Sequence, residues 1–254
     1  MRMVAATAIA AVLSIPAVFG PGSASAAEIK AMISNALKST MEEAGPQFEK
    51  ASGNKLTITF GAAAELKESI EKGAAVDVAL LTTATIDDLV KEGKLVAAGR
   101  ADIARSGAGV AARKGAPKPD ISTTEAFKHA LLDAKSIAFV GAGATAPYIK
   151  SLFVRLGIAD QVQSKLKVLP ATNPAANAVA NGEAELGITQ ISEILPYAGA
   201  ELVGPLPPDL QLYTVYPAAV AADTKEAASA NALIKFLTTP AAIAVLKAKG
   251  LSPG

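Results

Sequence analysis

The stretch LTITFGAAAELKESIEKGAAVDVALL, residues 56–81, decides the fold. Its first five residues are aliphatic, β-branched or aromatic and predict a strand. Helical periodicity follows over residues 63–72 and stops at Gly73, a residue type that commonly closes helices. Residues 76–81 form another short aliphatic run and predict a further strand. This alternation of strands with a helix is typical of the α/β class.

The alternation continues on both sides of this stretch. Residues 28–33 predict a strand, and residues 37–50 predict a helix. Pro46 falls inside that helix and should kink or break it, because proline has no N–H group to donate. Residues 136–140 predict a strand that runs into the small-residue loop 141–146. The chain is therefore expected to be α/β throughout.

Between these segments the signals are shorter. Thr85 is predicted as the N-cap of a helix that ends at Gly93. Residues 102–104 and 110–112 predict two separate short strands. A further strand is expected over residues 213–221, with a proline inside it.

The N-terminus has the three regions of a signal peptide. Arg2 precedes an apolar run over residues 4–19, and the small residues 23–27 follow. The apolar run is interrupted by Ser14 and Pro16 and is shorter than a membrane span. Residues 1–26 are therefore predicted to be a cleaved signal peptide, which predicts a periplasmic protein.

Charge and composition exclude several partners and chemistries. The chain has 24 Lys and Arg against 23 Asp and Glu, with no block of one sign. Such a balance gives no electrostatic footprint for nucleic acid. There is no Cys, so disulfides, thiolate metal sites and thiol nucleophiles are excluded.

Small and neutral polar residues follow the predicted strands at several places. Where such a loop leads into a helix, its backbone N–H groups and the helix dipole favour an anion or a polar ligand. A tight connection needs the same residue types, and both readings stay open for any single loop. The candidate ligand-binding residues are Ser34, Asn35, Ala36, Gly61, Ala62, Ala63, Ala64, Thr83, Gly143, Thr145, Ala146, Thr172, Asn173 and Gln190.

No pattern predicts a catalytic residue, a cofactor or a metal. Gly141, Gly143 and Ala146 match a dinucleotide-binding fingerprint in a suitable context, but Asp160 falls in a helix-terminating turn instead of ending a second strand. His129 is the single histidine and is expected on a helix surface. Without a second histidine or a Ser/His/Asp set, we expect that the chain is not an enzyme.

Several stretches together resemble the periplasmic binding proteins of the molybdate-binding type, within the type II class. They are residues 34–37, 60–64, 76–80, 181–188, 216–220 and 236–242. The resemblance implies two α/β lobes, each a sheet flanked by helices, joined by crossing strands. Lobe one would comprise residues 27–104 and 217–254, and lobe two residues 105–216. It also implies a ligand held between the lobes, a membrane permease of an ABC transporter as partner, and a monomer.

The resemblance is weaker at the residues that would contact the ligand. Binders of this type hold molybdate with two serine hydroxyls and a tyrosine, and Ala36, Ala64 and Gln190 stand at the corresponding positions. Each lost hydrogen bond to a buried anion costs about 1.5–3 kcal/mol. A small organic acid or a similar polar molecule, a neutral one included, is therefore expected in place of molybdate. Molybdate or tungstate binding, a secreted enzyme acting on an organic acid in the same cleft, and a sensor-type binding protein remain alternatives.

Overall fold

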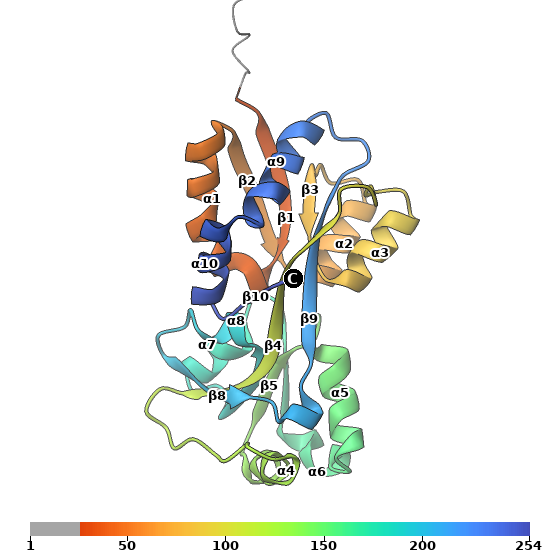
Figure 1. Cartoon of the computed structure of the whole chain (residues 1–254). Coiled ribbons are helices and arrows are strands. Elements are labelled where there is room, and N and C mark those ends of the chain that lie inside the picture. The colour runs from red at the N-terminus through yellow and green to blue at the C-terminus, as the bar shows by residue number, and fades with distance from the viewer. Residues whose placement is uncertain (1–25) are drawn as a thin grey trace, which may run out of the picture.

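The computed structural model of the chain describes residues 26–254. The predicted signal peptide lies outside the described residues except for Ala26. Two lobes stand one above the other, and two long strands run between them (Figure 1). The predicted two-lobed α/β fold is therefore confirmed.

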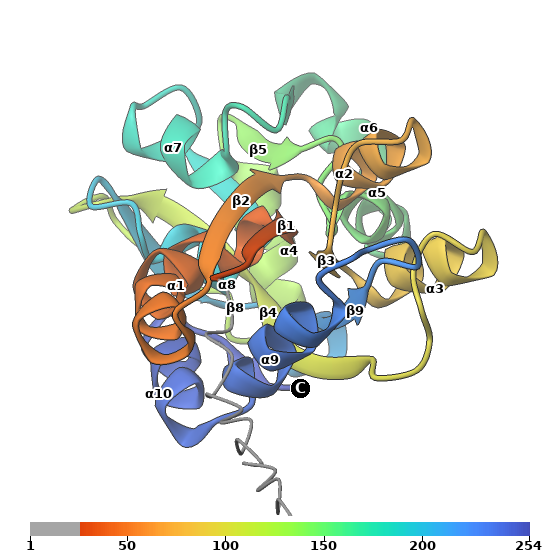
Figure 2. The ribbon, with the colours of Figure 1, turned by 90° about the horizontal axis from the view of Figure 1, so that it is seen from above.

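The upper lobe of Figure 1 contains a mixed sheet in the order β2-β1-β3-β9-β4. β1 pairs in parallel with β2 and β3, and β9 is antiparallel to both β3 and β4. Helices α1, α9 and α10 cover one face of this sheet, and α2 and α3 cover the other (Figure 2). The elements are β1 (Glu28–Ser34), η1 (Asn35–Leu37), α1 (Lys38–Ser52), β2 (Lys55–Gly61), α2 (Ala63–Glu71), β3 (Val78–Leu80), α3 (Thr83–Lys91), β9 (Tyr213–Val220), α9 (Ala227–Leu237), α10 (Pro240–Ala248) and β10 (Ser252–Pro253).

The lower lobe has its own sheet, in the order β4-β7-β5-β6, with β8 also paired to β4. β7, β5 and β6 are parallel to one another and antiparallel to β4. The elements are β4 (Ala101–Arg113), α4 (Thr124–Asp133), β5 (Ile137–Val140), α5 (Ala146–Arg155), α6 (Ala159–Val162), η2 (Gln163–Lys165), β6 (Leu166–Leu169), α7 (Ala175–Ala180), β7 (Leu186–Gln190), α8 (Ile191–Ile194), β8 (Ala200–Pro205) and η3 (Pro208–Leu210).

Strand β4 joins the two sheets. Residues 101–107 pair with β9 in the upper lobe, and residues 108–113 pair with β7 and β8 in the lower lobe. The prediction of two separate strands here is therefore wrong, because Ser106 and Gly107 continue the ladder and do not interrupt it. The predicted lobe boundaries at 104/105 and 216/217 fall inside β4 and β9 and stay a prediction.

A proline lies within the other crossing strand. Pro217 stands opposite Asp102, where the register between β4 and β9 shifts before Ala104. Since proline has no N–H for the ladder, an irregularity of this kind is where a strand tolerates it.

Each lobe buries its own core. In the upper lobe Phe48, Tyr216 and Leu37 are fully buried, and the rings of Phe48 and Phe236 lie 5.5 Å apart. In the lower lobe Phe127 and its aliphatic neighbours fill the space between β5, β7 and the helices. The largest buried clusters of the two lobes are therefore separate, and β4 and β9 connect the lobes.

Helix α1 runs through Pro46 without a break, so the expected break does not occur. A proline in a helix interior costs about 3 kcal/mol. Met41, Ala44 and Phe48 on the same helix are buried, and burying one large apolar side chain contributes about 1.5–3 kcal/mol. The packed face therefore outweighs the missing hydrogen bond.

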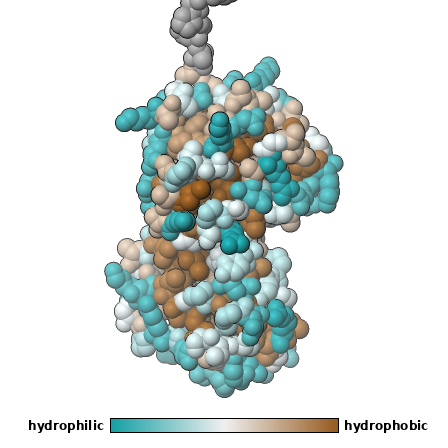
Figure 3. All heavy atoms as spheres, viewed as in Figure 1, coloured by the Kyte–Doolittle hydropathy of each residue, from teal (hydrophilic) through white to brown (hydrophobic). Residues whose placement is uncertain are grey.

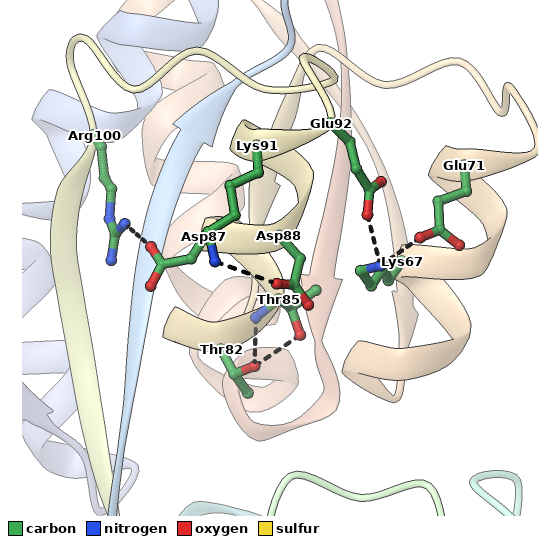
Figure 4. Close-up of polar contacts among 9 residues, drawn as sticks. All are labelled: Lys67, Glu71, Thr82, Thr85, Asp87, Asp88, Lys91, Glu92 and Arg100. Carbon is green, nitrogen blue, oxygen red and sulfur yellow. Dashed lines mark hydrogen bonds and ion pairs between the residues drawn. The ribbon is translucent and has the colours of Figure 1, made fainter.

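Polar contacts tie α2 to α3 and α3 to β4 (Figure 4). Lys67 of α2 lies between Glu71 and Glu92, and Arg100 pairs with Asp87. The N-cap of α3 is Thr82, whose hydroxyl accepts a hydrogen bond from the N–H of Thr85, and the prediction of Thr85 as the cap is wrong by three residues. Thr85 therefore lies in the first turn of the helix, not at its cap.

Among residues 26–254 no single helix is long and apolar enough to cross a membrane, and α9 with α10 passes that test only as a pair bent by 63°. Both helices pack their apolar faces into the upper lobe.

Candidate functional site

A cavity of about 500 Å³ lies between the lobes. Its walls are the segments that follow β1 and β2 in the upper lobe, and those that follow β5, β6 and β7 in the lower lobe. The molecule is narrowest between the lobes, and apolar side chains gather beside this waist (Figure 3). In α/β folds, ligands bind outside the carboxyl ends of the strands, and this cavity occupies that position.

The upper wall presents backbone donors. Ala62 is the N-cap of α2 and has no side-chain oxygen, so the first N–H groups of that helix receive no capping side chain. Ser34 occupies the equivalent position before η1, is almost fully buried, and makes no capping hydrogen bond. Both helical starts line the cavity. Unpaired N–H groups at such positions favour a negatively charged ligand.

The lower wall is formed by small residues after β5 and β6 and by α8. A β-carbon at Gly143 would lie 3.1 Å from the carbonyl oxygen of Val140, so a larger residue would force this turn to open by a few tenths of an ångström. Thr172 is exposed at the cavity wall. Ser192 of α8 is buried, and its hydroxyl lies 3.3 Å from that of Ser106 on β4. A hydroxyl on the cleft wall therefore contacts the crossing strand directly.

Glu193 is the notable charged group of the site. It is partly buried, lines the cavity, and accepts a hydrogen bond from the hydroxyl of Thr189. Burial raises the pKa of the Glu193 carboxyl, and the Thr189 hydrogen bond offsets only part of that rise. Burial and the nearby Glu193 carboxylate also raise the pKa of Tyr197, which lines the same cavity.

A buried polar group lies at the lobe junction. Gln190 at the end of β7 donates from Nε2 to the hydroxyl of Thr214 on β9, at 2.8 Å. Its Oε1 is buried without a hydrogen-bond partner, and the buried hydroxyl of Tyr216 lies near Ser34 and Thr214 without a hydrogen bond of good geometry to either. Desolvation, followed by the charge of Glu193, raises the pKa of Tyr216 well above its usual range. The end of β7 is therefore held against the crossing strand by a side-chain hydrogen bond.

The structure brings half of the sequence-predicted site residues together at the cavity. They are Ser34, Asn35, Gly61, Ala62, Ala63, Gly143 and Thr172. Because they come from four different strand ends, their convergence is a property of the fold.

The other predicted residues lie outside the lining. Ala36 and Ala146 are buried in the two cores, and Ala64 is exposed on α2. Thr145 is buried before α5, and Thr83 donates to the carbonyl oxygen of Val215.

Asn173 and Gln190 complete this second group. The Asn173 side chain donates to Glu183 and accepts from Asn177, so it secures the start of α7. Gln190 is directed to Thr214, as described above. These side chains support the walls, and their role in ligand binding stays a prediction.

Sequence reasoning missed the charged and aromatic residues of the site. They are Lys38, Glu42, Phe60, Glu65, Glu193 and Tyr197, and the hydroxyl residues Ser39 and Ser192 were missed with them. Lys38 supplies a positive charge that the strand-end loops themselves lack. A helical spacing would have found some of them, since Ser39 stands four residues after Asn35, on the same face of the chain.

Among residues 26–254 no cluster of three or more His, Asp or Glu side chains is placed to hold a metal ion. His129 is exposed on α4, lies 3.3 Å from Glu125 and is not among the residues that line the cavity.

A family model and two curated relatives each match most of the chain. A family model described as bacterial extracellular solute-binding protein matches residues 29–252. A protein named aconitate isomerase from a Pseudomonas species is 32% identical over 225 residues, 87% of this chain and 86% of the relative. The molybdate-binding protein ModA of Azotobacter vinelandii is 29% identical over 235 residues, 89% of this chain and 90% of the relative.

Solved structures support the same fold. The periplasmic molybdate-binding protein of Azotobacter vinelandii superposes with a TM-score of 0.76 at 21% identity, covering 89% of this chain and 99% of the other. The resemblance to periplasmic binding proteins of the molybdate-binding type is thereby confirmed.

The relative named as an isomerase overturns one expectation. The lack of Cys, of a second His and of a Ser/His/Asp set led us to expect that the chain is not an enzyme. A relative that is 32% identical over most of both chains carries an enzyme name. The expectation that the chain is not an enzyme is therefore wrong, because the absence of these residue types does not exclude catalysis. General acid–base catalysis can also use a single Asp, Glu, Lys or Tyr side chain, and the absence of Cys, of a second His and of a triad does not exclude one.

Proposed function

The chain belongs to the family of bacterial extracellular solute-binding proteins, and we propose that it binds a small polycarboxylic acid of the aconitate type between its lobes and interconverts its isomers. The observation that carries the proposal is the cavity. It combines uncapped helix N–H groups and Lys38 with a partly buried carboxyl, Glu193. The first two features suit carboxylates, and the third suits proton transfer.

The size of the cavity supports an organic ligand. A volume of about 500 Å³ lies in the range of small-molecule sites, roughly 300–1,000 Å³. A tetrahedral oxyanion would leave most of this space to water unless the lobes closed much further. The alanines at positions 36 and 64 offer no hydroxyl to such an anion.

Calorimetry and turnover test the proposal together. Purified protein lacking residues 1–26 is titrated with cis-aconitate, trans-aconitate, citrate, molybdate and tungstate. We expect one-to-one binding of an aconitate isomer, and conversion of one isomer into the other by proton NMR. Tight binding of molybdate or tungstate with no response to any organic acid would refute the proposal.

Delivery of the ligand to an ABC transporter is the second candidate function. The family membership and the two lobes on crossing strands favour it, since hinge closure around a ligand is the usual movement of such proteins. Scattering measurements should then show a smaller radius of gyration with ligand than without it. Affinity capture of the ligand-loaded protein by the permease in detergent would distinguish delivery from turnover alone.

The proposed location is the periplasm, reached through cleavage of residues 1–26. Mass spectrometry of the periplasmic fraction should find a chain that begins near Ala27. The proposed oligomeric state is a monomer, which light scattering after gel filtration measures directly.

A further inference from the structure

Three carboxyl groups line the cavity, and they differ in setting. Glu42 and Glu65 are exposed on the surfaces of α1 and α2, and Glu42 lies 3.9 Å from Lys38. Glu193 is partly buried on α8, directly after the C-terminal end of β7. No Lys, Arg or His of residues 26–254 lies within 4 Å of its carboxylate oxygens, in contrast to the paired acids elsewhere on the surface.

The side chain of Glu193 is held in place by a hydrogen bond and is not paired with a positively charged group of the described residues. Thr189 lies four residues earlier and donates its hydroxyl to one carboxylate oxygen. Tyr197 lines the cavity beside it, and Tyr216 lies close enough for its phenol to respond to the Glu193 charge. A carboxyl that is fixed by a neutral donor, lacks a neighbouring cation and has a raised pKa is suited to take up and release a proton.

We propose, resting on the function proposed above, that Glu193 carries the proton during isomerisation. Aconitate has a CH=C–CH₂ unit with a carboxylate on each of the three carbons. Glu193 removes a proton from the methylene carbon, and the electron pair of that C–H bond spreads over the three carbons and the adjoining carboxylate. The same proton, or one exchanged with water, then bonds to the former alkene CH.

This step balances without a further reactant. One C–H bond breaks and one forms, the double bond moves by one position, and the carboxyl ends in its starting state. Because both outer carbons carry a carboxylate, the product is again aconitate. Rotation about the central bonds before the proton returns decides between the cis and trans forms. The ligand's own carboxylates would lie toward Lys38 and the start of α2, where positive charge and N–H groups line the cavity.

The experiment compares Glu193→Gln with the unaltered protein in D₂O. Turnover by the unaltered protein should place deuterium on the methylene carbon of the product. Glu193→Gln should lower kcat by about 10²–10⁴-fold, the usual contribution of a general acid–base group. Its Kd for the aconitate isomer, measured by calorimetry, should change by less than about threefold, because glutamine keeps the size and the hydrogen bond to Thr189. Glu193→Asp should retain part of the turnover.

The matched control is Glu125→Gln, an exposed carboxyl on α4. It should leave kcat, Kd and deuterium incorporation unchanged, and a thermal melt of each variant reports folding. If Glu193→Gln keeps the full kcat, the assignment is overturned while the proposed function stands. If Glu193→Gln loses binding to the same extent as turnover, Glu193 is a binding group and the assignment is also overturned. If the unaltered protein neither binds nor converts aconitate, the proposed function fails, and this inference fails with it.

Discussion

Asp77 connects three separate segments of the upper lobe through hydrogen bonds. Its Oδ2 accepts a hydrogen bond from the N–H of Lys30 on β1, at 2.7 Å, and its Oδ1 accepts one from the hydroxyl of Thr224, at 2.5 Å. Its backbone carbonyl also accepts from Ala221. Asp77 therefore joins β1, the segment before β3, and the segment that follows crossing strand β9.

Replacing Asp77 by alanine removes both side-chain hydrogen bonds and keeps the backbone one. A hydrogen bond to a charged group contributes about 1.5–3 kcal/mol, and the partial exposure of this site favours the lower value. The free energy of unfolding should therefore fall by about 3 kcal/mol. For a chain of this size, each kcal/mol shifts Tm by about 2–4 °C. We expect Tm to fall by about 6–12 °C in scanning calorimetry.

The control for this change is Asp88→Ala. Asp88 is exposed on α3 and lies 3.9 Å from Lys91, a surface pair worth less than about 1 kcal/mol. Thr224→Val should cost about half as much as Asp77→Ala, and the double variant should cost less than the sum of the two. A fall in Tm at Asp77→Ala no larger than that at Asp88→Ala would refute the reasoning.

Three further changes probe the site and its supports. Burial raises the pKa of Glu193 above its ordinary value of 4.5, so its stabilising contribution is complete below that pH and is lost as pH rises through the folded-state pKa. Glu193→Gln should therefore gain stability relative to the unaltered protein as pH rises above 4.5, and equal pH profiles in urea unfolding would contradict this. Tyr216→Phe removes a buried hydroxyl that makes no hydrogen bond of good geometry to its neighbours Ser34 and Thr214. The change should be neutral or stabilising by up to about 2 kcal/mol in thermal unfolding, whereas a clear loss of stability would show that one of these hydrogen bonds forms. Gly187→Ala would place a β-carbon 3.1 Å from Val179 and 3.2 Å from the carbonyl oxygen of Ala175. The change should lower the free energy of unfolding by about 1–3 kcal/mol in urea and weaken ligand binding, because α7 must move away from β7. Unchanged stability would show that α7 moves without cost.

Local sequence determined the elements of this protein. The strand over residues 56–60, the helix that follows it and the stop at Gly73 depend on residues within a few positions of one another. The loops that lead into helices with unpaired N–H groups could be predicted for the same reason, because the residue before a helix decides whether a side chain caps it. Half of the predicted site residues accordingly line the cavity.

Local sequence also misled where pairing with distant strands took over. Ser106 and Gly107 resemble a break between two strands, but β9 supplies their hydrogen-bond partners, and β4 continues through them into the second sheet. Strand β8 has no predicted counterpart, and it forms because β4 offers it an edge. These residues have no strong preference of their own, so the partner strand decides their conformation.

The tertiary structure alone decided which charges face the ligand. Nothing in the residues around Glu193 distinguishes it from the many solvated acids of the chain, because the pKa of a carboxyl depends on the atoms packed around it and those come from distant segments. Lys38 likewise belongs to the site only because α1 begins beside the lower lobe's α8. Conformation over a few residues is set by neighbours along the chain, and the sequence shows it. Burial and electrostatic environment are set by neighbours in space, and they exist only once the two lobes have folded against the crossing strands.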